Sequence, residues 1–151
     1  MYSLKTPEAP LALTTFGIVP FLAPAGLMLR YQDDPIFMST AGLWLIAYAA
    51  VILSFLGGVR WGVEIVLRDK PRFAELTLSV LGALVGWALV LVYFQFANPY
   101  AFLGSAVALL LHFVIDRASP EMPLWYRKLR IWPTSAAIVC LLVAFYLFSR
   151  V

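Results

Sequence analysis

Residues 38–59 read MSTAGLWLIAYAAVILSFLGGV, and no charged side chain interrupts them. An α-helix needs about 20 consecutive apolar residues to cross the hydrocarbon core of a bilayer. The apolar character continues to Leu67, broken only by Arg60 and Glu64, so the stretch is longer than one crossing requires at a rise of about 1.5 Å per residue. It predicts a transmembrane helix that either tilts or carries its last turns out of the membrane.

Four further apolar runs, separated by short polar segments, repeat this pattern along the chain. Hydrophobic residues make up 63% of the sequence and charged residues 13%, whereas an ordinary soluble domain carries about 25% charged residues. The chain therefore has too few charges for a polar surface. We predict an all-α fold, a polytopic transmembrane bundle of about five helices that forms one integral membrane domain over residues 1–151. The expected spans are approximately 11–29, 38–62, 73–96, 100–115 and 132–149.

Prolines and short connections predict local detail in this bundle. Pro20 and Pro24 each remove a backbone donor from the first run and predict a kink there. Residues 98–99 leave so little chain between the third and fourth runs that we expect an antiparallel hairpin. Residues 121–130 mix aromatic and cationic side chains, which is typical of a short interfacial helix before the last span.

Small residues recur every four positions in the second run, at Ala50, Ser54, Gly58 and Gly62. Such a ridge lets two membrane helices approach closely. It packs either against a span of the same chain, which we favour, or against a ligand or partner. Residues 82–86 (GALVG) carry a second ridge in the third run. We therefore expect the second and third spans to form the tightly packed centre of the bundle.

Basic residues are distributed unequally between the two ends of the expected bundle. Only Arg30 and Arg150 fall at one end. The positive-inside rule then places the other end in the cytoplasm, which predicts a cytoplasmic N-terminus and a periplasmic C-terminus in a bacterial inner membrane. The net charge of +3 fits cationic loops, and we expect the lipid bilayer, not nucleic acid, as a partner. The crowded end holds Lys5, Arg60, Arg68, Lys70, Arg72, Arg117, Arg127, Lys128 and Arg130.

Four ionisable side chains lie near the cytoplasmic ends of the second and fourth runs. Arg60 and Glu64 share one helical face, and they form either a structural ion pair or part of a site. His112, the only histidine, precedes Asp116 by one turn. It acts either in proton or metal chemistry or as an interfacial residue that reaches water or a partner, the interpretation we favour. A cluster of these four side chains is the sharpest site hypothesis.

Two tryptophans stand beside glycines in the expected spans. Trp61 fits a belt at the membrane interface. Trp87 lies in mid-span, where we expect it to fill an internal gap, with the wall of a pocket for a flat ligand as the alternative. The candidate set for binding a ligand or partner is Gly58, Arg60, Trp61, Gly62, Glu64, Trp87, His112 and Asp116.

The sequence lacks the motifs of known membrane-enzyme chemistry. It contains no phosphate-binding loop, nucleophile elbow, paired catalytic carboxylates or HExxH-type metal motif. Two candidate ligands four positions apart are a weak metal signal without a third. We therefore expect a non-enzymatic protein without catalytic residues or a metal site, and the sequence identifies no cofactor.

Three segments carry a family resemblance that covers nearly the whole chain. Residues 17–21 (GIVPF), 54–62 (SFLGGVRWG) and 124–130 (LWYRKLR) resemble a family of small uncharacterised proteobacterial inner-membrane proteins, a domain of unknown function with mitochondrial transmembrane relatives. The resemblance implies an integral inner-membrane protein without an assigned activity. The distribution of that family implies, as a hypothesis, contact with membrane proteins of energy-converting complexes.

Three functions are compatible with these features. The leading hypothesis is a non-enzymatic accessory or assembly factor that contacts other membrane proteins. The first alternative is a binder or carrier of a small lipophilic ligand such as a quinone, porphyrin or lipid. The second is a small proton- or ion-coupled transporter that uses the four ionisable side chains. It ranks last because these charges lie toward one end and the chain shows no internal repeat.

Overall fold

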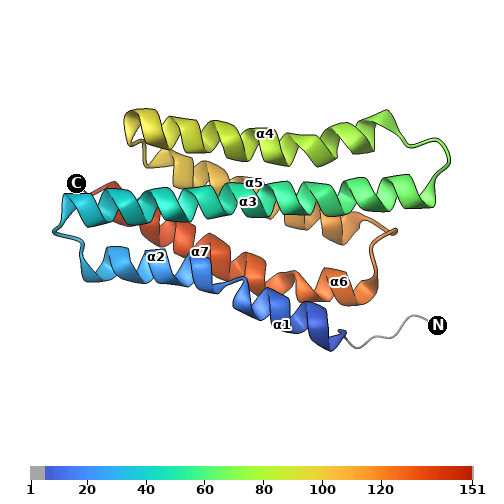
Figure 1. Cartoon of the computed structure of the whole chain (residues 1–151), viewed down its shortest axis with the longest axis horizontal. Coiled ribbons are helices and arrows are strands. Elements are labelled where there is room, and N and C mark those ends of the chain that lie inside the picture. The colour runs from blue at the N-terminus through green and yellow to red at the C-terminus, as the bar shows by residue number, and fades with distance from the viewer. Residues whose placement is uncertain (1–5, 151) are drawn as a thin grey trace.

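The computed structural model describes residues 6–150, and within this range the chain forms helices and no strands. Five of its helical segments are long and apolar enough to cross a membrane, which confirms the predicted all-α transmembrane bundle. The helices pack side by side along one long axis (Figure 1). They are α1 (Glu8–Phe16), α2 (Val19–Arg30), α3 (Pro35–Leu67), α4 (Phe73–Phe96), α5 (Tyr100–Ala118), α6 (Leu124–Leu129) and α7 (Ile131–Phe148).

The first span is broken between α1 and α2, at residues 17–18. Pro20 has no backbone N–H, so the regular helical ladder cannot continue through this point. The hydroxyl of Tyr48, on α3, donates a hydrogen bond of 2.7 Å to the backbone carbonyl of Gly17. The predicted kink is therefore a break just before Pro20, which lies in the first turn of α2, whereas Pro24 lies further inside that helix.

Helix α3 runs through the centre of the bundle and contacts α2, α4, α5 and α7. It begins at Pro35, and the Asp34 carboxylate caps it by accepting hydrogen bonds from the next two backbone N–H groups. Its 33 residues rise about 50 Å, compared with about 30 Å for the hydrocarbon core of a bilayer. It continues through residues 57–58 as one helix, so its length exceeds one crossing, as predicted.

Glycines bring α3 and α4 into close contact. The backbone carbonyl of Ser79 lies so near Gly57 that a methyl group there would clash with it. Gly86 faces Ala50, whose Cα is 2.9 Å from the position of an added Cβ. However, α4 packs mainly on α3 and α5 and lies at the edge of the bundle. The predicted tight packing of these two spans is thus confirmed, whereas the prediction that both lie at the centre is right for α3 and wrong for α4.

The remaining helices complete the bundle around α3. A left-handed Ala97, with φ of 46°, ends the fourth helix just before residues 98–99. Helix α5 then returns beside α4 as the predicted hairpin (Figure 1). The short helix α6 precedes α7, as predicted for residues 121–130.

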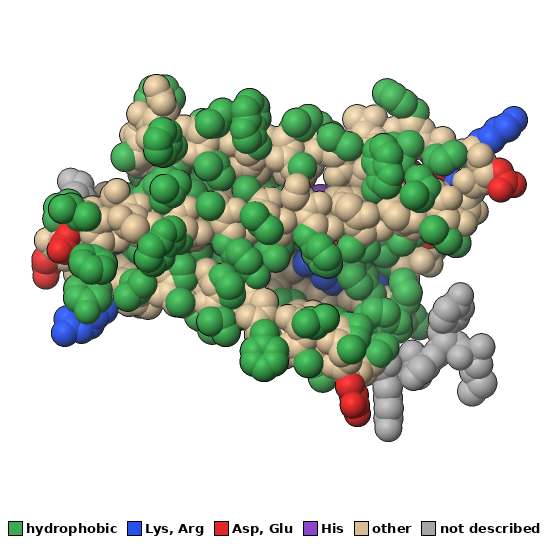
Figure 2. Space-filling model, viewed as in Figure 1, with side chains coloured by type: hydrophobic (Ala, Val, Ile, Leu, Met, Phe, Trp, Pro, Cys, Tyr) green, Lys and Arg blue, Asp and Glu red, His purple; other side chains and the backbone are tan. Residues whose placement is uncertain are grey.

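Apolar side chains cover most of the visible surface, and most of its charged side chains lie toward the two ends (Figure 2). Blue side chains also show in a hollow below α3. The loop between α3 and α4 and the connection between α5 and α6 lie at the same end (Figure 1). This end carries the basic group that the sequence identified, apart from Lys5, which lies outside the described residues. The orientation of this end in a membrane stays a prediction.

Candidate functional site

A buried ionic cluster joins α3, α4 and α5 at the basic end of the bundle. The Arg60 guanidinium donates hydrogen bonds to Glu75 at 2.7 Å, Ser119 at 3.0 Å and Asp116 at 3.3 Å. Arg60 is 8% exposed and Asp116 is 1% exposed. Buried charges are tolerated when they are paired and hydrogen-bonded, so this cluster holds three helices in a defined arrangement.

Asp116 also connects this cluster to the last span. Its Oδ2 accepts a hydrogen bond of 3.4 Å from the Tyr126 hydroxyl. The same oxygen lies 3.6 Å from Nε of Arg130, a distance that makes an ion pair but is too long for a hydrogen bond. One buried carboxylate thus faces two guanidinium groups, one on each oxygen.

Glu64 belongs to a neighbouring network and not to the pair predicted with Arg60. Its carboxylate accepts hydrogen bonds from Arg72 at 2.8, 2.9 and 3.0 Å and pairs with Arg68 at 3.2 Å. The hydrogen bonds to Glu64 raise the pKa of Arg72 above its ordinary value. Glu121 closes the network by pairing with both arginines. Because these pairs link residues 68–72 to the connection before α6, they tie two loops together.

Among the described residues, His112 makes no ion pair or hydrogen bond with the charged side chains that the sequence grouped with it. It is buried and packs against α4, where a Cβ added at Gly82 would lie 2.6 Å from its Nε2. Its Nδ1 has no hydrogen-bond partner within residues 6–150. Of the four side chains in the predicted cluster, the structure joins Arg60 directly to Asp116. Glu64 connects to Arg60 through Arg72 and Glu75 and lines the same small pocket, whereas His112 pairs with none of the three.

The tryptophans and open glycines of the predicted set face outward. Trp87 is 62% exposed, so it does not fill an internal gap, contrary to the expectation. Trp61 is also exposed. A Cβ added at Gly58 or Gly62 would meet no atom within 4 Å among the described residues. The α3–α4 contact uses Ala50 of the predicted ridge together with Gly57, and not Gly58 or Gly62.

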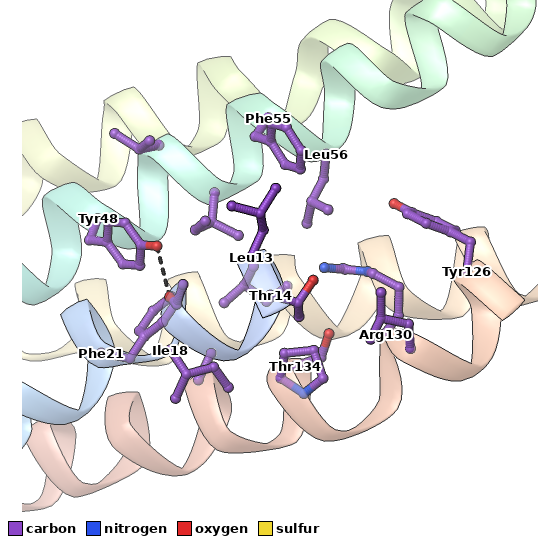
Figure 3. A pocket seen from close by; sticks show the side chains of 17 residues that line it. Leu13, Thr14, Ile18, Phe21, Tyr48, Phe55, Leu56, Tyr126, Arg130 and Thr134 are labelled. Carbon is purple, nitrogen blue, oxygen red and sulfur yellow. Dashed lines mark hydrogen bonds between the residues drawn. The ribbon is translucent and has the colours of Figure 1, made fainter. Parts of the chain in front are cut away.

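A cavity of about 350 Å³ lies on the other side of α3 (Figure 3). It is enclosed by α1, α2, α3 and α7, with contributions from α5 and α6. Its wall is mostly aliphatic and aromatic, and the residues labelled in Figure 3 point into it from opposite sides. The lining residues are Leu13, Thr14, Gly17, Ile18, Phe21, Tyr48, Val51, Ile52, Phe55, Leu56, Leu109, Tyr126, Leu129, Arg130, Pro133, Thr134 and Ala137.

Two buried polar side chains face this cavity with polar atoms that make no hydrogen bond within the described chain. Arg130 is 9% exposed and Thr134 is 5% exposed. In the part of the chain that the structure describes, Nε and Nη2 of Arg130 and the hydroxyl of Thr134 make no hydrogen bond. Sequence reasoning assigned these residues no role at a site. Their spacing from Tyr126, four and eight positions on, was the available signal of a polar stripe on one helical face.

The cavity offers hydrogen-bond donors and a positive charge. Its lining includes one cation, Arg130, and no carboxylate, histidine or cysteine among the described residues. Residues 6–150 also contain no group of three potential metal ligands. The arrangement is suited to holding a molecule with an acceptor group at one end and an apolar body.

Comparison with known proteins places the chain in a family. A family described as "Protein of unknown function (DUF3429)" matches residues 6–146. The chain belongs to this family. The family predicted from residues 17–21, 54–62 and 124–130 is thereby confirmed.

Two curated relatives are similar over most of the chain. Transmembrane protein 69 of Mus musculus is 30% identical over 148 residues, which cover 97% of the chain and 59% of the relative. Transmembrane protein 69 of Xenopus tropicalis is 30% identical over 144 residues, which cover 89% of the chain and 53% of the relative. The chain thus spans between half and three fifths of these relatives. No solved structure matches it.

Proposed function

We propose that the chain is a membrane-embedded binding protein for a small lipophilic ligand, held in the cavity between α2, α3 and α7. The observation that carries this proposal is an apolar cavity into which Arg130 and Thr134 bring unpartnered polar atoms. Small-molecule sites are typically apolar pockets of about 300–1,000 Å³ with a few placed polar groups. The volume of about 350 Å³ lies within that range.

The neighbouring surface supports access from the bilayer. Val51 lines the cavity and is 59% exposed. A second, shallower apolar groove adjoins it on the outer surface, between α2 and α3, and shares Tyr48 and Val51 with the cavity. A lipophilic molecule dissolved in the membrane therefore has an apolar route to the site.

Photolabelling with a diazirine-bearing dodecanol tests this proposal on the purified full chain. We expect the probe to label the cavity-lining part of α3, residues 48–56, and Val51→Trp to reduce that labelling by narrowing the opening. Val139→Trp is the matched control, because Val139 has the same 59% exposure but does not line the cavity. Labelling spread evenly over the lipid-facing helices, and equal in all three proteins, would overturn the proposal.

A second candidate function is an accessory protein that contacts another membrane protein. The observation that favours it is the outward-facing small-residue stripe on α3, where Ser54 and Gly58 are exposed. Such a stripe accommodates a helix of another chain. Gentle extraction followed by mass spectrometry should then recover a stoichiometric partner that Gly58→Leu releases. Recovery of the chain alone would count against this candidate.

A further inference from the structure

We infer that the ligand of the cavity is an amphipathic anion, whose carboxylate or phosphate group binds the Arg130 guanidinium and the Thr134 hydroxyl. This inference rests on the proposed ligand-binding function and adds the charge of the ligand's polar end. Its basis is the set of hydrogen bonds and charges that surround these two side chains.

Two nitrogens of the Arg130 guanidinium, Nε and Nη2, lack hydrogen-bond acceptors among the described residues. An arginine carries five N–H donors in a planar fork, and Arg130 donates no hydrogen bond to any described residue at its Nε or Nη2. Leaving buried donors unsatisfied is costly. Figure 3 shows the guanidinium reaching into the cavity, where the Thr134 hydroxyl points toward the same space. An acceptor bound there would satisfy both groups.

The charges around the cavity favour an anionic acceptor over a neutral one. The carboxylate nearest to Arg130 belongs to Asp116, and its oxygens already accept hydrogen bonds from Arg60 and Tyr126. Arg130 therefore shares this charge at 3.6 Å without a hydrogen bond. No carboxylate lines the cavity within the described chain. Carboxylates and phosphates match the guanidinium fork with two parallel hydrogen bonds.

The rest of the cavity fits an apolar chain attached to that anionic group. Phe21, Val51, Phe55 and Leu56 form its wall on the side of α2 and α3. Because Val51 opens toward the outer surface, a chain longer than the cavity can extend into the bilayer. The polar end would lie near α7 and the apolar end near the outer face of α3.

Competition against the photoreactive dodecanol shows which polar group the cavity prefers. Dodecanoate, dodecyl phosphate and unlabelled dodecanol share one chain and differ only at the polar end. We expect at least one of the two anions to displace the probe at about 10-fold to 100-fold lower concentration than dodecanol. Preference for dodecyl phosphate assigns a phosphate group, and preference for dodecanoate assigns a carboxylate.

Substitutions in the cavity test whether Arg130 and Thr134 bind the anionic group. Arg130→Met should remove the advantage of the anions, and Arg130→Lys should retain part of it because the charge remains. Thr134→Val keeps every ion pair and should weaken anion binding by about 2-fold to 10-fold. Lys128→Met removes an exposed cation from the adjacent helix and should change nothing.

The outcomes distinguish this inference from the proposed function. Equal competition by all three molecules, unchanged in Arg130→Met and Thr134→Val, overturns the anionic ligand. If the dodecanol probe still labels the cavity and Val51→Trp still blocks it, the ligand-binding function stands in that case. If the probe does not label the cavity of the wild type, the proposed function itself fails.

Discussion

The two sides of α3 pack in opposite ways. On the side of α4, Gly57 and Gly86 let two backbones approach so closely that an added Cβ would clash with the facing helix. On the side of α2 and α7, the break at residues 17–18 and the larger side chains leave a cavity of about 350 Å³. One side of the same helix therefore serves packing, whereas the other is suited to binding.

The comparison shows that small and polar residues have different roles on the two sides of α3. Lipid gives no hydrophobic drive for helices to associate, so close packing and polar pairs hold the bundle. The glycines and the cluster around Arg60 supply both on the α4 and α5 side. On the cavity side, Arg130 and Thr134 are buried without full partners. That contrast is consistent with the proposed binding function, because buried polar groups without hydrogen bonds reduce stability.

The largest expected effect comes from breaking the ionic cluster on the packed side. Arg60→Met removes the shortest ion pair of both Asp116 and Glu75. We expect the free energy of unfolding to fall by about 3 kcal/mol, because the Asp116 carboxylate is buried and loses an ion pair. Thermal unfolding in detergent can be followed by the reactivity of Cys140, which is buried and the only cysteine. The control, Arg68→Met, removes a more exposed arginine and should cost about 1 kcal/mol or less.

A smaller effect is expected from adding one methyl group to the α3–α4 contact. Gly57→Ala places a Cβ against the backbone carbonyl of Ser79, and overpacking of this kind costs about 1–3 kcal/mol. Gly58→Ala is the matched control, because its Cβ would meet no described atom within 4 Å. Equal unfolding temperatures for the two variants would show that the close contact does not stabilise the bundle.

Removing the hydrogen bond at the break in the first span should reduce stability by a smaller amount still. Tyr48→Phe removes the donor to the Gly17 carbonyl, and we expect a loss of about 1 kcal/mol. The hydroxyl of Tyr146 makes no hydrogen bond identified in the described structure, and its side chain is exposed, so Tyr146→Phe should leave stability unchanged. An equal loss of stability in both variants would mean that losing a tyrosine hydroxyl, and not this hydrogen bond, causes the effect.

The smallest expected effect has the opposite sign. Thr134→Val replaces a buried hydroxyl that lacks a partner with a group of the same shape, so stability should stay equal or rise by up to about 1 kcal/mol. Thr77→Val is the control, because that hydroxyl is exposed and bonds the carbonyl of Phe73 in its own helix. A clear loss of stability in Thr134→Val would mean that its hydroxyl has a partner, which would weaken the functional reading of the cavity.

The sequence alone determined the class of fold. Uncharged apolar runs of about 20 residues are long enough to cross a membrane. They do so as helices, because a helix satisfies every backbone polar group within its own segment. The position of the break near Pro20 and the short helix before the last span also follow from local chemistry, since a proline lacks a donor and residues 121–130 mix rings with cations. The joining of Arg60 to Asp116 followed from the two charges lying near the same end of neighbouring spans.

Only the tertiary structure decided which face of each helix met another. The four-residue spacing continued the ridge from Ala50 to Gly58, yet the contact with α4 continues from Ala50 to Gly57 and leaves Gly58 open. Gly57 lies one position, or about 100° around the helix, from Gly58. Trp87 faced outward for the same reason. Periodicity defines a face, but the direction in which that face points depends on the neighbouring helices. The cavity with Arg130 and Thr134 arises where several helices fail to meet, and a space of this kind has no pattern in one chain segment.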